Sequence, residues 1–495
     1  MRIAFVNPQG NFDPANSYLA AHPDFGGQLV YVREVSRALG RMGHRADILT
    51  RRISDPDWPE FSGESDTYPD HENVRVLRVP CGPNRFLPKE ELWPYLGEWA
   101  EGVANLYREE GSWPDLWTGH YADGGLCAAL LEEVSGVPFT FTAHSLGAWK
   151  LDLLLQGDEE LSEADTRFNF AARIEAERVS MARSAIIVTN SAAERREQYD
   201  HPAYQDAASV EDDGRFAVIP PGVNFEVFGA EVKSPWEDEV RGRIQTAHER
   251  DIAPERRGLP AVISWSRLDP KKNHLALVRA FAQNSELRER ANLLVITRGL
   301  DDPLRDNGAN GGATEEQRTV LSAMTEEIES ADLWGCVAAF SLSGQSILAA
   351  LYRWGAETGG VFCLPAEYEP FGLTVVEAMA VGLPVVATQN GGPRETTDEG
   401  RAGILADPHD PGDIARGLLR LLSDHETWRT FAERGQDRAR EQYSWERAAE
   451  GYLRLAGETA GGPRQSDHTF IIPEFARDPR PAALPRLRSW TTRKG

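Results

Sequence analysis

The sequence predicts an α/β protein with two doubly wound domains, each a mostly parallel sheet flanked by helices. Short apolar runs alternate with helix-length amphipathic segments along both halves of the chain, which is typical of parallel sheets. A Pro-Pro-Gly break at residues 220–222 interrupts this alternation, which restarts near residue 260. The 495 residues are enough for two domains, each with its own core.

The apolar runs give the expected strands in order. In the first half they lie at 2–8, 45–52, 74–80, 116–121, 139–144 and 184–190, and the run 216–228 closes the series. In the second half they lie at 260–268, 291–299, 336–342, 359–372, 384–392 and 402–408. Helical patterns are expected at 26–43, 412–424 and 427–443.

These patterns also set the expected domain bounds. The first domain covers residues 1–230 and the second covers 231–445, with the polar stretch 230–258 expected as a linker into the second. Residues 446–495 are expected as a helix that returns to the first domain, followed by a Pro- and Arg-rich tail. Doubly wound sheets bind ligands at the carboxyl ends of their strands, so the loops there hold the candidate site residues.

Composition restricts the class of partner and the compartment. The net charge of −24 argues against a nucleic acid or an anionic membrane as the main partner. No apolar run approaches the roughly 18 residues of a membrane span, and a cytoplasmic location is expected. Four cysteines without a CxxC pair are expected as reduced core thiols rather than metal or redox groups: Cys81, Cys127, Cys336 and Cys363.

Lysine is rare, because only six of the 53 basic residues are lysine. Four of the six lie in segments that carry other site candidates: Lys89, Lys150, Lys271 and Lys272. A compact ammonium suits phosphate binding, whereas arginine prefers bidentate forks. The alternative is codon bias that leaves a few lysines by chance.

The segment "SRLDPKKNH" at residues 266–274 directly follows an expected strand. Arg267 and Lys272 lie five positions apart on this loop, where a guanidinium fork and an ammonium can hold a diphosphate. The alternative is an exposed basic loop beside Asp269. Spacing alone leaves a phosphate-binding loop and this alternative both open.

The segment "DFGGQ" at residues 24–28 places Gly26 and Gly27 before a helix and Gln28 in its first turn. Glycine lets a ligand approach the backbone closely, and a helix N-terminus favours anions. Two glycines alone are a weak signal. The segment is not GxGxxG, so the nicotinamide fingerprint is absent.

Three further segments carry candidates in the first half. His144 and Lys150 lie in "TAHSLGAWK" after an expected strand, where the histidine either binds a ligand or satisfies the core. Lys89 lies in "RFLPKEELWPYL" at residues 85–96. Arg173 shares an expected helix with Arg167 and Arg178, for which a solvated charged face is the alternative.

The stretch "EYEPFGLTVVEAMA" places Glu369 in a loop and Glu377 in the helix that starts near Gly372. Paired carboxylates serve as acid and base in glycoside hydrolysis, or they accept hydrogen bonds from sugar hydroxyls. The amides of Phe371, Gly372 and Leu373 at the helix start suit an anion.

Together these segments resemble retaining glycosyltransferases of the GT-B fold, with two Rossmann-like domains facing each other across a deep cleft. The Arg267/Lys272 spacing and the Glu369–Glu377 pair match donor-site motifs of that superfamily. The segments "NPQGNFDP", "HPDFGGQLVYVREVS", "FLPKEELWPYL", "VIPPGVN" and "EPFGLTVVEAMAVGLP" are similar to the sucrose-phosphate synthase family, in its short bacterial form without a phosphatase domain. The similarity covers nearly the whole chain.

The resemblance implies transfer of glucose from UDP-glucose to fructose 6-phosphate with the anomeric configuration retained. For the donor it implies that Arg267 and Lys272 hold the diphosphate and that Glu377 accepts a hydrogen bond from the ribose. Glu369 binds the hexose with the backbone of Phe371, Gly372 and Leu373, while His144 contacts the sugar near its primary hydroxyl and Gly27 closes on the donor. The implied acceptor residues are Gly26, Gln28, Lys89, Lys150 and Arg173.

No DxD-like dyad stands out at a strand end. Arg267, Lys272 and helix N-termini are therefore expected to neutralise the diphosphate, with no required cofactor or metal and with magnesium at most a non-essential activator. No nucleophile stands out beside the donor carbon, and the family is thought to use front-face displacement, in which the leaving phosphate takes the acceptor proton.

One departure leaves other functions open. Where the family commonly has paired arginines, this chain has Ala171 and Ala172, and only Arg173 remains. The alternatives are a mannosylfructose-phosphate synthase that uses GDP-mannose and a related glucosyltransferase with another acceptor. Two further alternatives are a silent regulator that binds sugar nucleotides and a hydrolase that uses Glu369 and Glu377 as acid and base.

Overall fold

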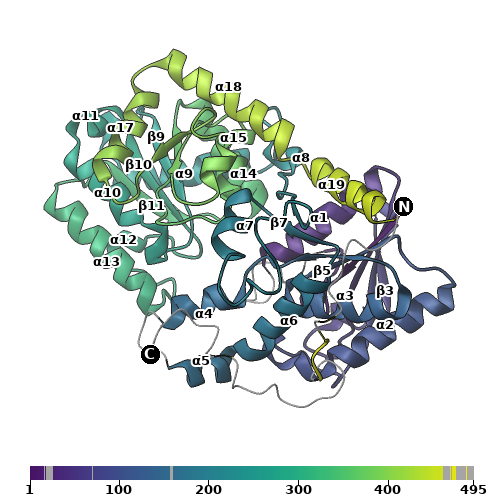
Figure 1. The fold of residues 1–495 in the computed structure, drawn as a ribbon. Helices are drawn as coiled ribbons and strands as arrows, with labels where there is room; N and C mark the ends of the chain where they lie inside the picture. The colour runs from purple at the N-terminus through teal and green to yellow at the C-terminus, as the bar shows by residue number, and fades with distance from the viewer. Residues whose placement is uncertain are drawn as a thin grey trace. The chain divides into compact units, whose positions relative to one another are not determined.

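The computed structural model describes residues 1–15, 17, 26–69, 71–155, 160–460, 469, 471–474 and 487. The chain divides into two compact units, shown in Figure 1. Unit 1 comprises Met1–Gly222 and Trp445–Gly495, and unit 2 comprises Val223–Ser444. The division after Gly222 falls at the Pro-Pro-Gly break itself, eight residues before the bound at residue 230 that the sequence predicts.

Unit 1 contains an eight-stranded sheet in the order β3-β4-β2-β1-β5-β6-β7-β8. Its strands are β1 (Arg2–Val6), β2 (Arg45–Arg51), β3 (Ser65–Tyr68), β4 (His71–Val79), β5 (Leu116–His120), β6 (Phe139–Thr142), β7 (Ile186–Thr189) and β8 (Phe216–Val218). All neighbours pair in parallel except β3, which is antiparallel to β4. The sequence did not predict β3, because its residues SDTY form no apolar run and only Tyr68 is buried.

Helices cover both faces of this sheet. On one face, α1 (Gly27–Arg41) packs against α19 (Trp445–Thr459), the segment that returns from unit 2. On the other face, α3 (Tyr121–Ser135) packs against α2 (Leu96–Glu110) and α6 (Phe170–Arg183). The remaining helices are η1 (Pro59–Phe61), η2 (Lys89–Glu91), η3 (Trp93–Tyr95), α4 (Gly147–Leu155), α5 (Leu161–Phe168) and α7 (Ala192–Gln198).

Unit 2 contains a six-stranded, all-parallel sheet in the order β11-β10-β9-β12-β13-β14. Its strands are β9 (Ala261–Trp265), β10 (Asn292–Thr297), β11 (Val337–Ser341), β12 (Val361–Leu364), β13 (Val385–Thr388) and β14 (Ile404–Ala406). Side chains alternate between two cores, as on β9, where Ile263 joins one cluster and Val262 the other. Burial on both faces explains the continuous apolar runs.

The helices of unit 2 flank this sheet in two layers, as Figure 1 shows. One core cluster includes residues of α8 (Phe225–Phe228), α9 (Glu237–Asp251), α14 (Gln345–Glu357) and α15 (Leu373–Ala380). The other includes residues of α10 (His274–Gln283), α11 (Ser285–Arg290), α12 (Pro303–Asp306), α13 (Glu315–Ser330), α17 (Pro411–Leu422) and α18 (His425–Gln442). Three short helices complete the unit: η4 (Pro254–Arg256), η5 (Pro270–Lys272) and α16 (Pro393–Thr396).

The prediction of a linker at residues 230–258 is wrong. Helix α9 lies within this stretch and belongs to unit 2. It is very polar overall, yet Val240, Ile244, Ala247 and His248 are buried at helical spacing. Three apolar side chains and His248, at intervals of four, three and one residue, dock the helix although its composition is that of a surface segment.

The four cysteines are free and buried, as predicted for core thiols. Burial raises the pKa of all four thiols, which keeps them protonated and unreactive.

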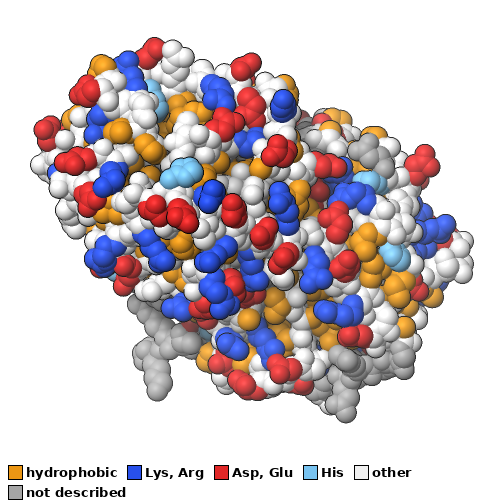
Figure 2. Space-filling view, turned by 90° about the horizontal axis from the view of Figure 1, so that it is seen from above, with side chains coloured by type: hydrophobic (Ala, Val, Ile, Leu, Met, Phe, Trp, Pro, Cys, Tyr) orange, Lys and Arg blue, Asp and Glu red, His pale blue; other side chains and the backbone are white. Residues whose placement is uncertain are grey.

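Within the described part of the chain, no helix combines the length and apolarity that crossing a membrane requires. On the face drawn in Figure 2, acidic and basic side chains are intermingled, in keeping with the mixed composition.

Candidate functional site

A pocket at the carboxyl ends of the unit 1 strands gathers three of the predicted site residues. Lys89, Lys150 and Arg173 line this pocket together with Asp123. The other lining residues are Glu90, Trp93, Tyr121 and Phe168. These side chains come from six helices and from positions up to 84 residues apart, so only folding brings them together. We call this group the cationic pocket.

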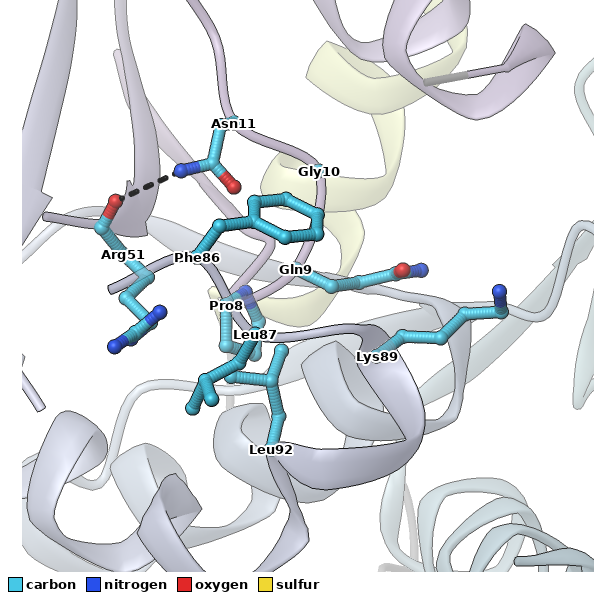
Figure 3. Close-up of a pocket in the computed structure, with 9 residues that line it drawn as sticks. All are labelled: Pro8, Gln9, Gly10, Asn11, Arg51, Phe86, Leu87, Lys89 and Leu92. Carbon is cyan, nitrogen blue, oxygen red and sulfur yellow. Dashed lines mark hydrogen bonds between the residues drawn. The ribbon is translucent and has the colours of Figure 1, made fainter. Parts of the chain in front are cut away.

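The segment that carries Lys89 is held in place by Arg51, at the end of β2. Arg51 is buried, and its guanidinium donates to three main-chain oxygens of the following loop, those of Cys81, Pro83 and Arg85. Figure 3 shows Arg51 on one side of a neighbouring pocket, with Lys89 and Gln9 extending towards the other. Arg51 therefore fixes the course of the loop that carries Lys89, whose ammonium lies 3.2 Å from Glu90 Oε1 at the edge of the cationic pocket.

Lys150 lies among other cations. Its ammonium nitrogen is 4.2 Å from the centroid of the Phe168 ring. Burial and then the positive charges of Arg173 and Lys89 lower the pKa of Lys150, although Glu90 partly opposes them. A bound anion would relieve this repulsion, so the electrostatics of the pocket favour a phosphate group.

Arg173 is buried and fixed from two sides. Its Nε donates to Glu177 Oε1 at 2.9 Å, and its Nη2 donates to the main-chain oxygen of Ser145 at 2.6 Å. Its guanidinium carbon lies 4.6 Å from the centroid of the Tyr121 ring. The alternative of a solvated helix face is thus wrong for Arg173, which is 4% exposed.

The two alanines that precede Arg173 on α6 are also buried. Ala171 and Ala172 are 6% and 7% exposed and belong to the same core cluster as Phe170. Arg178, one helical turn beyond Arg173, pairs with Asp206 instead of lining the pocket. Of the arginines on α6, Arg173 alone is among the residues that line the pocket.

Asp123 is a pocket residue that the sequence analysis missed. It lies in the first turn of α3, accepts a hydrogen bond from Gln9 N at 3.1 Å and is 3% exposed. Its Oδ1 has no hydrogen-bond partner within the described structure. Burial raises the pKa of Asp123 to about 7. The signal in the sequence was a charged residue in the small, apolar run "HYADGGLCAA", directly after a strand.

His144 directly follows β6 and adopts a left-handed backbone with φ of +57°. Its Nε2 lies 2.8 Å from Nδ1 of His120, and its ring meets Tyr31 edge-on at 5.3 Å. Burial lowers the pKa of His144 to about 3, so the imidazole is neutral at pH 7. One ring nitrogen is therefore satisfied by the protein while the half-buried ring still reaches the surface.

Gly26 and Gly27 begin α1 as predicted, and both are exposed. A side-chain carbon at either position would meet nothing within 4 Å, so the fold itself does not demand glycine there. The Gln28 side chain accepts from Gln9 Nε2 at 3.1 Å and donates to Asn7 Oδ1 at 3.2 Å. Asp24 and Phe25 of the same motif lie outside the described residues.

In unit 2, the loop after β9 brings Lys272 to Glu369. The Lys272 ammonium donates to Glu369 Oε2 at 2.6 Å, with both side chains less than one-fifth exposed. Arg267 is 81% exposed and lies 3.8 Å from Asp269. The structure thus brings one of the two predicted cations to the glutamate loop and leaves the other extended into solvent.

Two residues between these elements hold the loop. Asn273 adopts a left-handed conformation, and its amide donates to the main-chain oxygens of Pro365 and Pro408. Buried His274 contacts the Ser266 hydroxyl at 2.9 Å, and burial lowers its pKa to about 4. The phosphate-binding loop predicted from "SRLDPKKNH" is therefore tied to the ends of β12 and β14.

Glycines shape the turn between Glu369 and α15. Gly372 caps the helix with φ of +88°, a conformation that strains residues with a side chain. Gly391 lies against the loop so closely that a side-chain carbon would come within 2.3 Å of the Glu369 carbonyl oxygen. The Phe371, Gly372 and Leu373 backbone consequently lies at the N-terminus of an eight-residue helix.

Glu377 is 5% exposed, and burial raises the pKa of its carboxyl to about 8. The facing Tyr352 is fully buried, and its hydroxyl has no hydrogen-bond partner in the described structure. Glu369 by contrast is ion-paired with Lys272. The two carboxylates thus have different environments, one paired with a cation and one held neutral by burial.

Comparison with known proteins identifies related families for both units. A family model described as "Glycosyl transferase 4-like domain" matches residues 26–208, and one described as "Glycosyl transferases group 1" matches residues 246–438. The catalytic domain of starch synthase IV from Arabidopsis thaliana shares the fold, with a TM-score of 0.61 at 15% identity, covering 93% of this chain and 99% of that one.

Three sucrose-phosphate synthases match most of the chain. A probable one from Thermosipho melanesiensis is 38% identical over 96% of this chain and 99% of its own length. The Zea mays enzyme is 34% identical over 93% of this chain, which spans about half of that longer protein (48%). The structure from Thermosynechococcus elongatus has a TM-score of 0.64 at 25% identity, covering 93% of this chain and 99% of that one.

These matches confirm the predicted α/β fold class of two doubly wound domains, the enzyme class and the resemblance stated from the motifs. The chain is a hexosyltransferase of the GT-B fold and belongs to the sucrose-phosphate synthase family.

Proposed function

We propose that this chain transfers glucose from UDP-glucose to fructose 6-phosphate and makes sucrose 6-phosphate, with the anomeric configuration retained. The observation that carries the choice of acceptor is the cationic pocket, where Lys89, Lys150 and Arg173 line one site. The whole-chain similarity to the Thermosipho melanesiensis relative supports the choice of donor. The four buried free thiols fit a reducing compartment, and the cytoplasm is our proposed location.

The cationic pocket would bind the 6-phosphate of the acceptor. Lys150 and Lys89 supply ammonium groups, and the fixed guanidinium of Arg173 supplies directed donors. Asp123 has a free acceptor oxygen for a fructose hydroxyl. Gly26 and Gln28 would close on the acceptor through the start of α1, where Gln28 already bridges Asn7 and Gln9.

The donor would bind at the strand ends of unit 2. Lys272 exchanges Glu369 for the diphosphate and thereby frees the Glu369 carboxylate for hexose hydroxyls. The exposed Arg267 closes on the same phosphates, and the amides of Phe371, Gly372 and Leu373 support them at the start of α15. Glu377 would accept from the ribose, while Gly27 and His144 would contact the hexose.

The reaction then breaks the bond between the anomeric carbon and the diphosphate oxygen and forms a bond from that carbon to the acceptor hydroxyl oxygen. The hydroxyl proton passes to the departing phosphate oxygen on the same face of the sugar. Lys272 and Arg267 stabilise the negative charge that grows on the diphosphate. Because these two cations neutralise that charge, we propose that turnover needs no metal and that magnesium acts at most as an activator.

A matrix of donors and acceptors tests the proposal. UDP-glucose, ADP-glucose and GDP-mannose are each combined with fructose 6-phosphate, fructose and glycerol, and released nucleotide and the anomeric configuration of the product are measured. We expect the highest kcat/KM for UDP-glucose with fructose 6-phosphate and an α-glucoside product. A preference for GDP-mannose would identify the mannosyl alternative instead, and no release with any pair would identify a silent binding protein.

A further inference from the structure

A buried row of hydrogen bonds connects His144 to the returning helix α19. His144 Nε2 contacts His120 Nδ1 at 2.8 Å, and His120 Nε2 contacts the Thr118 hydroxyl at 3.0 Å. The Thr118 hydroxyl is in turn a hydrogen-bond partner of Tyr452, on α19. His120, Thr118 and Tyr452 are all completely buried. The proposed function uses only the first member of this row.

The far end of the row fixes the direction of its protons. The Tyr31 hydroxyl lies 3.4 Å from that of Tyr452 and donates its only proton to the main-chain oxygen of Ile219 at 3.1 Å. Tyr31 can therefore only accept from Tyr452. Tyr452 satisfies all three of its hydroxyl contacts when it donates to Tyr31, which has no proton left to give, and accepts from Thr118 and, at 3.3 Å, from Thr142.

Each further group in the row likewise accepts from the next group once its own proton has been donated. Thr118 has given its proton to Tyr452, so its oxygen accepts from His120 Nε2–H. His120 is neutral, because burial lowers its pKa well below the usual value, so its Nδ1 carries no proton. His144 must therefore donate from Nε2, which leaves its Nδ1 as a bare acceptor. Among the described residues, Nδ1 of His144 has no hydrogen-bond partner.

We propose that Tyr452 is a positioning residue which, through Thr118 and His120, holds His144 in the tautomer protonated at Nε2. His144 then presents Nδ1 as an acceptor for a hydroxyl of the transferred hexose, and it does not act as a donor or as an acid. The contact with the hexose rests on the proposed function, whereas the tautomer is a property of the ligand-free protein. Helix α19, which belongs to the C-terminal segment of unit 1, thus sets the tautomer of a residue more than 300 positions earlier in the chain.

Nitrogen NMR of protein labelled with ¹⁵N-histidine tests the tautomer directly, and His144→Gln assigns the signal among the 11 histidines. In the wild type we expect His144 protonated at Nε2. Tyr452→Phe keeps the ring but removes the hydroxyl, and we expect mixed tautomers and a roughly tenfold lower kcat/KM for the donor. The KM for the acceptor should stay unchanged.

Tyr107→Phe is the matched control, because Tyr107 is equally buried in unit 1 and its hydroxyl bonds Asp47 at 2.7 Å, away from His144. It should leave the His144 signal unchanged. If Tyr452→Phe fails to fold, Thr118→Val should break the row, and Thr118→Ser, which keeps a hydroxyl, should restore the wild-type signal.

Wild-type His144 protonated at Nδ1, or a signal that neither Tyr452→Phe nor Thr118→Val alters, would overturn this proposal. Failure of the wild type to transfer any hexose would instead overturn the proposed function. The NMR result would still decide the tautomer in that case, because it needs no substrate.

Discussion

The two candidate sites hold their positive charge in opposite ways. In unit 1, buried Arg173 and half-buried Lys150 lie near Lys89, and burial together with the charges of Arg173 and Lys89 lowers the pKa of Lys150. In unit 2, Lys272 is already neutralised by Glu369, and Arg267 is extended into solvent. In unit 1, Arg173 is paired with Glu177 and Lys89 with Glu90, but Lys150 has no carboxylate partner among the described residues. In unit 2, Lys272 must exchange Glu369 for an anion.

This difference fits the two ligands that we propose. A phosphate that is bound but not transformed is best met by fixed, preorganised charge, since little changes during the reaction. A diphosphate that leaves with growing charge is stabilised by cations that bind it more strongly as the bond breaks. The ion pair of Lys272 with Glu369 also keeps both groups satisfied before the donor arrives.

The largest expected effect on turnover is that of a substitution at Lys272. Lys272→Ala should lower kcat by about 10³-fold, because it removes a cation from the leaving diphosphate. Release of nucleotide diphosphate under saturating donor and acceptor measures the effect. The neighbouring Lys271 is exposed and serves as the matched control, since Lys271→Ala should stay near wild-type kcat. Turnover of Lys272→Ala within a few-fold of wild type would remove Lys272 from the diphosphate site.

Lys150→Met should affect binding instead of turnover. The change keeps the apolar stem against Phe168 but removes the ammonium, so the KM for fructose 6-phosphate should rise roughly 30- to 100-fold. The KM for the donor should not move. Initial rates with varied fructose 6-phosphate and with unphosphorylated fructose measure the effect, and an equal loss for both acceptors would contradict a phosphate contact. Arg178→Lys, on the same helix as Arg173 but outside the pocket, is the control.

Glu377→Gln should make the protein more stable at pH 8 but weaken its binding of the donor. The folded chain keeps the proton of Glu377 up to about pH 8, whereas the unfolded chain releases it near 4.5. The unfolded state thus binds fewer protons between these values, and the free energy of unfolding falls as the pH rises through them. The variant lacks this loss, so its advantage in stability over wild type should grow from pH 5 to pH 8 and reach at least about 1 kcal/mol.

Denaturant titrations of ligand-free wild type and Glu377→Gln across this pH range measure the difference. The same variant should bind the donor about tenfold more weakly, because its amide cannot ionise, whereas Glu377 can release its proton and then accept from both ribose hydroxyls. A stability difference that is independent of pH would show that Glu377 does not hold a proton in the folded chain.

Removal of divalent metal should have the smallest effect. With Lys272 and Arg267 neutralising the diphosphate, EDTA should change kcat by less than about twofold, and added magnesium should restore at most that factor. Rates before and after chelation and dialysis measure this. Loss of most activity that magnesium then restores would show that the two cations do not suffice.

Much of the fold was predictable because burial on both faces gives parallel strands continuous apolar runs, as at residues 261–265. The errors have the same physical origin. Strand β3 pairs at a sheet edge with one buried residue, and α9 docks through four buried residues within a highly charged helix. Each of these two elements has too few apolar residues for its strand or helix periodicity to be recognised in the sequence.

The candidate site was predictable where one short segment carries it. Arg267 and Lys272 share a loop, and Glu369 lies eight residues from Glu377, so residue type and spacing identified them. Asp123 was missed because its distinguishing property, a buried oxygen without a partner, exists only once α3 packs beside the loop of Gln9. Their ligand-binding roles stay predictions until the variants are measured.

The sequence by itself determined the class of fold, the family and most of the candidate residues, because these depend on apolar period and on short motifs. Only the tertiary structure decided what each charge faces. It placed Lys89 and Lys150 at one pocket, paired Lys272 with Glu369 and buried Glu377. A pKa and a tautomer depend on neighbours that are distant in sequence, as Tyr452 is from His144, and packing alone brings those neighbours together.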